Sequence, residues 1–169
     1  KSWVGVGGSQ ESVIRAARYD FPLMLAIIGG SPTRFTSFID QYQNSRKQFN
    51  LPVGEVAIHC PGHIAETDEK AKQTVWPHLQ GMYAKIGRER GWPPMRYDQF
   101  QFGTSPDGAM FIGSPDTVAR KIVDVTNLLG VDRFDMKYSN GTMPHEDCMD
   151  SIKLFATEVI PRVRELREE

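Results

Sequence analysis

The first thirty residues alternate between apolar and turn-forming segments in an order that strongly restricts the fold. Residues 3–6 form a short apolar run, residues 9–19 have the pattern of a helix, and residues 23–28 form a second apolar run. The second run does not alternate between apolar and polar side chains, which is typical of a strand covered on both faces. A strand, a helix and a buried strand in this order predict a parallel sheet with helices packed against it.

A turn of two glycines and a hydroxyl residue joins the first strand to the first helix. The segment Gly7-Gly8-Ser9-Gln10 is followed by Ser12 in the first turn of that helix. Unpaired backbone N–H groups and the positive end of the helix dipole favour an anion such as phosphate there. The same residues also fit an ordinary connection in which Ser9 caps the helix. The position after a strand favours the anion site, because ligands of parallel α/β proteins gather at the carboxyl ends of strands.

Strand and helix patterns continue to alternate along the rest of the chain. Apolar spacing and capping residues predict a helix from 32 to about 49, a strand over 52–59, a helix over 66–86, a helix over 114–129, a strand over 133–138 and a helix over 145–168. We expect Thr67 or Asp68 to cap the helix over 66–86, and the last helix to be interrupted near Pro161.

Residues 87–112 interrupt this alternation. They contain Trp92-Pro93-Pro94, Gly103, Pro106 and Gly108, and they show no long periodic pattern. We therefore predict a long loop over a ligand face, placed before the penultimate helix.

Four consecutive strand–helix units are compatible with two folds, and the pattern alone leaves both open. They can form a small doubly wound sheet or half of a (β/α)8 barrel. The length of 169 residues suits one domain over residues 1–169 with a sizeable core.

Charge and composition narrow the class of protein. The formal net charge is −1, so we expect neither nucleic acid nor a membrane as a partner. The two cysteines lie far apart, and the sequence has no secretory-type apolar region, so we expect a cytoplasmic protein. The chain begins with Lys1-Ser2 directly before the first strand, from which we expect a fragment of a longer protein.

Several groups of residues carry a resemblance to a known family. They are the glycine turn with the following 16–25, the segment 113–115, the pair 140–141, and 151–156 with 159–161 in the last helix. In their order along the chain they resemble the bacterial-luciferase-like, flavin-dependent monooxygenases. Together these segments extend over nearly the whole sequence, and they point to the superfamily rather than to a substrate.

The resemblance implies a fold, a cofactor and a reaction. The fold is α/β, the C-terminal half of a (β/α)8 TIM barrel, with four βα units that correspond to strands five to eight. The turn Gly7-Gly8-Ser9-Gln10 and the hydroxyl of Ser12 correspond to the place where the family holds the flavin phosphate. The implied cofactor is reduced FMN, with a deazaflavin as the alternative. The implied reaction inserts one oxygen atom into a small organic substrate.

The resemblance also implies what this half lacks. The catalytic histidine and the basic residues that complete flavin binding belong to the first half of the family barrel, so the catalytic residues are unknown here. Ile27 corresponds to a position near the isoalloxazine ring, where the luciferases have an aromatic residue. We therefore expect part of a flavin-dependent monooxygenase. The alternatives are a deazaflavin-dependent oxidoreductase of the same superfamily and a non-catalytic flavin-binding or assembly module.

The residues argue against two other kinds of site. His59, Cys60 and His63 have the side chains of zinc ligands, but no second short-spaced pair completes a four-ligand site, so we expect no metal. We expect His59 to end its strand facing the barrel mouth and His63 to be a solvated loop residue. Ser9 lacks the G-x-S-x-G pattern of a hydrolase nucleophile.

A half barrel leaves two strand edges unpaired and an inner face uncovered. Folded proteins avoid this state by pairing or covering such surfaces. We therefore expect the chain to pair, either as a homodimer or with the missing N-terminal half.

Overall fold

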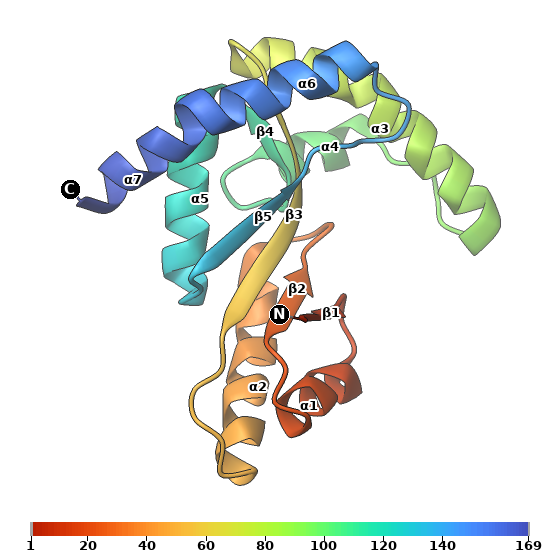
Figure 1. The fold of residues 1–169 in the computed structure, drawn as a ribbon. Helices are drawn as coiled ribbons and strands as arrows, with labels where there is room; N and C mark the ends of the chain where they lie inside the picture. Colours follow the sequence, from red (N-terminus) through yellow and green to blue (C-terminus); the bar gives the residue numbers. More distant parts are fainter. Residues whose placement is uncertain (1, 169) are drawn as a thin grey trace.

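The computed structural model describes residues 2–168 and contains a parallel sheet flanked by helices (Figure 1). The strands are β1 (Val4–Val6), β2 (Leu23–Ala26), β3 (Val56–Ile64), β4 (Phe111–Gly113) and β5 (Arg133–Lys137). Four of them lie in the spatial order β1-β2-β3-β5, and β4 pairs with the last residues of β3. The predicted alternation of parallel strands and helices is therefore confirmed.

Helices connect all these strands. They are α1 (Gln10–Arg18), the 3-10 turn η1 (Pro32–Phe35), α2 (Thr36–Gln48), α3 (Asp68–Arg90), α4 (Tyr97–Thr104), α5 (Pro115–Leu129), α6 (His145–Leu154), the π-helical turn η2 (Phe155–Val159) and α7 (Ile160–Glu168). Among the described helices, none has the length and apolar character needed to cross a membrane.

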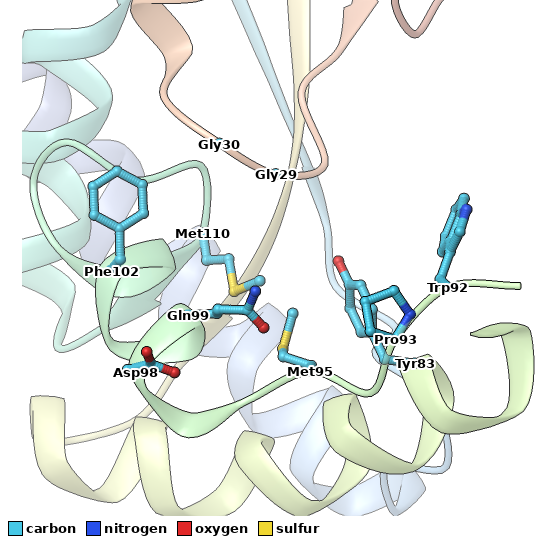
Figure 2. Close-up of a pocket in the computed structure, with 10 residues that line it drawn as sticks. All are labelled: Gly29, Gly30, Tyr83, Trp92, Pro93, Met95, Asp98, Gln99, Phe102 and Met110. Carbon is cyan, nitrogen blue, oxygen red and sulfur yellow. The ribbon is translucent and has the colours of Figure 1, made fainter.

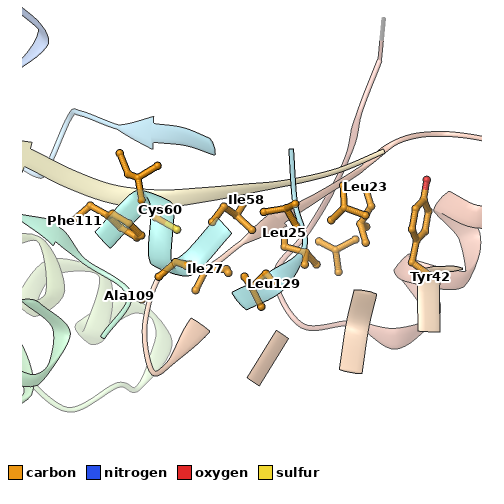
Figure 3. Close-up of a cluster of buried hydrophobic side chains, with 14 of the residues drawn as sticks. Leu23, Leu25, Ile27, Tyr42, Ile58, Cys60, Ala109, Phe111 and Leu129 are labelled. Carbon is orange, nitrogen blue, oxygen red and sulfur yellow. The ribbon is translucent and has the colours of Figure 1, made fainter. Parts of the chain in front are cut away.

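The main core lies between one face of the sheet and the helices packed on it (Figure 3). Leu23, Leu25 and Ile58 alternate along their strands and are fully buried. They belong to one cluster with Val13 of α1 and Ile122 of α5. Burial of each such side chain stabilises the fold by about 1.5–3 kcal/mol relative to leaving it exposed.

A tryptophan and two charged side chains lie on the opposite, inner face of the sheet. Trp3 and Arg133 precede Val4 and Phe134, which pack on the core, so alternation turns Trp3 and Arg133 to the inner face. The Arg133 guanidinium lies 5.3 Å from the centre of the Trp3 ring. It also makes two hydrogen bonds to Asp135, at 2.8 and 3.1 Å. A side chain just before β1 and one from β5 therefore meet over the inner face.

β3 differs from the strand predicted over 52–59. It runs over Val56–Ile64, so His59 lies inside the strand rather than at its end. His63, expected in solvent, is only 2% exposed. The last part of β3 pairs with β4, with Gly62 opposite Phe111. Pro61 and Gly62 normally end a strand, but pairing with two distant segments extends it: β5 pairs with β3 as far as Pro61, and β4 pairs with it from Gly62 onward.

The loop predicted over 87–112 contains regular structure. α3 continues through Arg90 and ends at Gly91, whose φ of 70° is left-handed, and α4 and β4 then follow. α4 has no apolar stripe long enough to be recognised in the sequence. It is held by tertiary contacts, because Phe100 is buried with its ring centre 4.9 Å from that of Trp76.

Several helix ends agree with their sequence signals. Ser9 caps α1, and Thr67 caps α3 by accepting a hydrogen bond from the Lys70 N–H at 3.1 Å. α5 ends at Gly130 with a φ of 61°. The expected interruption of the last helix is the π-helical turn η2, which ends two residues before Pro161. Proline lacks the N–H that would continue the helical pattern.

Asp68, the other candidate cap of α3, connects α3 to α5. Its carboxylate accepts a hydrogen bond from the Ser114 N–H at 2.6 Å and another from the Thr117 hydroxyl at 3.0 Å. Partial burial acts to raise the pKa of Asp68, but these hydrogen bonds outweigh it and the net shift is downward. The carboxylate thus satisfies the N-terminus of α5 from the neighbouring unit.

Candidate functional site

The carboxyl ends of the strands form one edge of the sheet, which we call the ligand edge, and three cavities adjoin it. The turn cavity, about 310 Å³, lies beside Gly7 and Gly8 after β1. The central cavity, about 550 Å³, lies beside Gly29 after β2. The basic cavity, about 210 Å³, lies beside Lys137 at the end of β5. Gly29 lines the turn and central cavities and Tyr83 lines the central and basic ones, so the three are adjacent.

The turn predicted to bind an anion is exposed and has a bare backbone. Gly8 has a φ of 137°, and no atom lies within 4 Å of the place where a Cβ would stand on Gly7 or Gly8. The Ser9 hydroxyl accepts a hydrogen bond from the Ser12 N–H at 3.2 Å. Gln10 is exposed and is the first residue of α1. The capping role of Ser9 is therefore confirmed, and the anion-binding role of the five residues remains a prediction.

The carboxylate of Glu11 already lies at this helix N-terminus. It accepts a hydrogen bond from the Ser9 hydroxyl at 2.9 Å. Its own backbone N–H and the Ser9 hydroxyl lower the pKa of Glu11. The N-terminus of α1 thus attracts a negative charge, as its dipole predicts. Glu11 is an exposed side chain, so it can turn away, but a phosphate at the turn would compete with it.

Two arginines that the sequence analysis did not select lie near the turn. Arg34 lines the turn cavity together with Gly7 and Gly8. Arg15 donates a hydrogen bond to the Ser12 hydroxyl at 3.0 Å. Arg34 lies in the segment that follows β2, as Ser12 lies in the segment that follows β1. The carboxyl ends of adjacent parallel strands meet at one edge of the sheet. The position of Arg34 after the second predicted strand could therefore have indicated that it lies near the turn.

The position that corresponds to a flavin-ring contact in the family does not face the ligand edge here. Ile27 is fully buried in the main core with Leu25 and Ile58 (Figure 3). Its neighbour Ile28 is 54% exposed and lines both the turn and basic cavities. The strand β2 ends at Ala26, and the side chain available to a ligand is that of Ile28.

The central cavity lies between the β2 turn and the segment 91–110, which we call the insertion. Met95 and Gln99 come from the insertion, and Met110 from its end. In Figure 2 these three side chains point into the space that faces Gly29 and Gly30. Methionine side chains adapt well to flat or irregular ligands, and the Gln99 amide adds a donor and an acceptor.

The end of the insertion is fixed by a buried lysine of α5. Lys121 Nζ donates hydrogen bonds to the carbonyls of Ser105 and Met110, at 2.5 and 2.8 Å, and lies 5.1 Å from the Phe111 ring centre. Burial lowers the pKa of Lys121 to about 8. Below that pH the ammonium is charged and holds both carbonyls, so the wall of the central cavity is attached to α5.

Histidine and cysteine do not build a reactive centre at this edge. Within residues 2–168, no histidine lines any of the three cavities, and no group of three metal-ligating side chains occurs. Cys60 is buried, and burial raises its thiol pKa to about 12.

Comparison with known proteins places this arrangement in a fold class. No protein-family model and no curated protein matches the chain. Solved structures do match over nearly its whole length, and they include flavin-dependent monooxygenases of the luciferase-like fold. The predicted fold class, half of such an α/β barrel, is confirmed.

Three of these structures illustrate the likeness. Monooxygenase RslO1 from Streptomyces bottropensis is 19% identical, with a TM-score of 0.67 over 93% of this chain and 46% of its own. The oxygenating constituent of 3,6-diketocamphane monooxygenase from Pseudomonas putida, in complex with FMN, is 17% identical, with a TM-score of 0.69 over 95% and 49%. Coenzyme F420-dependent tetrahydromethanopterin reductase from Methanopyrus kandleri is 17% identical, with a TM-score of 0.61 over 94% and 50%. The chain therefore spans about half the length of these proteins.

Proposed function

We propose that this chain is one half of a luciferase-like flavin-dependent monooxygenase and holds the phosphate of reduced FMN at the Gly7-Gly8-Ser9 turn. The observation that carries the proposal is the bare turn at a helix N-terminus, with Arg34 lining the same cavity. Helix N-termini with free N–H groups bind phosphate, and arginine binds it through two parallel hydrogen bonds. The likeness to an FMN complex supports the choice of cofactor.

The residues present fit the phosphate end of this cofactor. The open space at Gly7 and Gly8 lets a ligand approach the backbone, which any Cβ would obstruct. Arg34 and Arg15 supply positive charge, and Ser12 supplies a hydroxyl. Gln10 would contribute its backbone N–H in the first turn of α1. The competing Glu11 carboxylate is exposed and has to leave the turn first.

The adjacent central cavity would take the rest of the cofactor and part of the substrate. Half of its lining residues have methionine or aromatic side chains, including Met95, Met110 and Trp92, and these suit the apolar parts of a ligand. When bound, reduced FMN supplies the electrons that activate dioxygen for insertion of one oxygen atom into an organic substrate. The protein contributes orientation and a dry environment. The general acid or base would come from outside the described residues.

A deazaflavin is the alternative cofactor, because a coenzyme F420-dependent reductase shares the fold. A non-catalytic flavin-binding module is the other alternative. Oxygen-dependent loss of substrate, followed with reduced FMN in the presence and absence of a complementary half barrel, separates the monooxygenase from the binding module, and the same assay with reduced coenzyme F420 in place of FMN tests the deazaflavin. Turnover only with both halves supports the monooxygenase, and flavin binding without turnover in either case supports the binding module.

We expect the chain to bind FMN more tightly than riboflavin, which lacks the phosphate. Arg34→Gln should lower the affinity for FMN about tenfold, the usual effect of losing one charged hydrogen bond. The same change should leave riboflavin affinity unchanged. Quenching of flavin fluorescence on titration with protein measures both. The matched control is Arg18→Gln, an exposed arginine at the other end of α1. Equal affinity for the two flavins would contradict the proposal.

The carboxylate at the turn gives a second variant for the same assay. Glu11→Gln removes the negative charge that lies at the N-terminus of α1. We expect it to strengthen FMN binding severalfold and to leave riboflavin binding unchanged, because only the phosphate competes with this charge. A weaker affinity for FMN in this variant would place the phosphate elsewhere.

We also propose that the chain pairs through the outer edges of β1 and β5, with a second copy or with a complementary half barrel. In residues 2–168 neither edge has a strand partner on its outer side, and unpaired strand edges are normally covered. Size-exclusion chromatography with light scattering on this polypeptide is expected to give twice the mass of one chain. A well-folded monomer would leave the complementary half as the partner to test, and a monomer that also fails to bind that half would overturn the proposal.

A further inference from the structure

The basic cavity combines an apolar wall with two cations. Leu79, Met82 and Ile86 of α3 form one side of the apolar wall. Arg90 and Lys137 line the same cavity, and no acidic residue does so within the described chain. A cavity of about 210 Å³ is small. It therefore suits a compact apolar molecule with one negatively charged group.

Both cations have hydrogen-bonding capacity left for a ligand. Arg90 lies over the ring of Trp92, with its guanidinium 5.2 Å from the ring centre, and such stacking leaves its N–H groups available. Lys137 Nζ donates one hydrogen bond, to the carbonyl of Ser139. Neither side chain forms an ion pair with another residue of the described chain. Two unpaired cations therefore share one apolar cavity.

The environment of Lys137 favours a bound anion. Lys137 is half-buried, and this burial lowers the pKa of its ammonium group. Removing a cation from water costs free energy unless an opposite charge or hydrogen bonds compensate. A carboxylate in the cavity would compensate the half-buried charge of Lys137 and would also be attracted by Arg90, which lines the same cavity, and the hydrocarbon part would cover the α3 wall.

The buried amide of Asn140, which also lines the cavity, does not define the ligand. Asn140 Nδ2 donates a hydrogen bond to the Gly62 carbonyl at 2.9 Å. Its Oδ1 is buried and accepts no hydrogen bond from the described residues. Because this oxygen is shielded, a hydroxyl ligand cannot reach it without a shift of the loop after β5. Arg90 and Lys137 are the charged groups that line the cavity.

We propose that the basic cavity is a binding site for a small apolar monocarboxylate, held by Arg90 and Lys137 at its charged end. The site goes beyond the proposed flavin function, and it stands whether or not the turn binds FMN. In a flavin-bound protein the ligand would lie next to the central cavity, because Tyr83 and Trp92 line both cavities.

Three ligands with the same tail and different head groups test the proposal on the whole chain. Isothermal titration calorimetry with octanoate, octanol and octylamine compares an anion, a neutral group and a cation. We expect octanoate to bind at one site per chain, about tenfold more tightly than octanol, and octylamine to bind most weakly. The reason is that the positive charges of Arg90 and Lys137 attract the carboxylate, do not attract the hydroxyl as strongly, and repel the ammonium group. Octanol binding as tightly as octanoate, or no saturable octanoate binding, overturns the proposal.

Variants locate the site. Arg90→Gln and Lys137→Gln should each weaken octanoate binding about fivefold and leave octanol binding unchanged. Lys85→Gln, an exposed residue of α3 outside the cavity, is the matched control and should have no effect. Arg90→Lys keeps the charge and should retain affinity. If Lys85→Gln weakens octanoate as much as Arg90→Gln does, the attraction is a general surface effect and the site is wrong. FMN and riboflavin affinities measured on the same samples show separately whether the proposed function fails.

Discussion

Gly108→Ala should destabilise the protein by about 3 kcal/mol, near the upper end of the cost of overpacking. A Cβ on Gly108 would overlap the backbone carbonyl oxygens of Phe102 and Gly103 at the end of α4. These atoms cannot rotate away as side-chain ends can. The Met110 N–H donates to the Gly103 carbonyl at 2.8 Å, so the overlap also strains this contact. Urea unfolding followed by circular dichroism measures the loss.

Gly81→Ala is the matched control for this substitution. Gly81 lies inside α3, is exposed, and has no atom within 4 Å of its Cβ position. Alanine there should stabilise the helix by about 0.5–1 kcal/mol. Because Met110 lines the central cavity, Gly108→Ala should also weaken ligand binding there. Equal unfolding free energies for the two variants would show that the turn after α4 tolerates a side chain.

Arg46→Met should cost about 3 kcal/mol of stability and leave the ligand edge intact. Arg46 is 4% exposed. It donates from Nε to the Pro52 carbonyl at 2.7 Å, from Nη2 to Asp20 at 2.7 Å, and from Nη1 to the Tyr42 hydroxyl at 3.4 Å. Removing it leaves the Pro52 carbonyl without this donor in a partly buried place.

The position of Arg46 explains why binding should survive. Asp20 precedes β2 and Pro52 precedes β3, so the network lies at the amino ends of the strands, away from the ligand edge. In such barrels this end serves stability. Arg46→Lys keeps the positive charge but lacks the several N–H donors of the guanidinium group, so it should give an intermediate loss of stability. The exposed neighbour Lys47→Met should change the unfolding free energy by less than about 0.5 kcal/mol. If Arg46→Met changed the unfolding free energy by as little as Lys47→Met, the hydrogen bonds of Arg46 would not stabilise the fold as we propose.

The parts of the fold that local patterns determine were predictable. Ser9, Thr67 and Gly130 mark helix ends by chemistry that acts within a few residues, and the structure has those ends there. The extension of β3 and the strand β4 depend on each other across a long stretch of chain. Neither has a local signal, because Pro61 and Gly62 indicate the opposite. A pairing between distant segments overrides such a signal only once the chain is folded.

The candidate site also contains some residues with local sequence signals and others that only the folded structure brings together. The Gly7-Gly8-Ser9 turn follows from a strand, glycines and a helix start, all adjacent in the sequence. Arg34 reaches the same cavity from the next unit. Lys121, which holds the insertion from α5, resembles a polar residue on a helix surface in the sequence alone. Its burial follows from carbonyls that the insertion brings to it. Side chains that act across units need the packed structure to be found.

β3 has a consequence for how binding and folding depend on each other. It pairs with β2 and β5 through its first residues and with β4 through its last. The barrel sheet and the ligand-edge insertion are thus two ends of one continuous strand. Local opening of the insertion releases the end of β3 as well, and opening of β3 releases every strand that it joins. A ligand held against the insertion therefore raises the stability of the whole half barrel by mass action, and hydrogen exchange in β2 and β5 would slow on binding although no ligand touches those strands' centres.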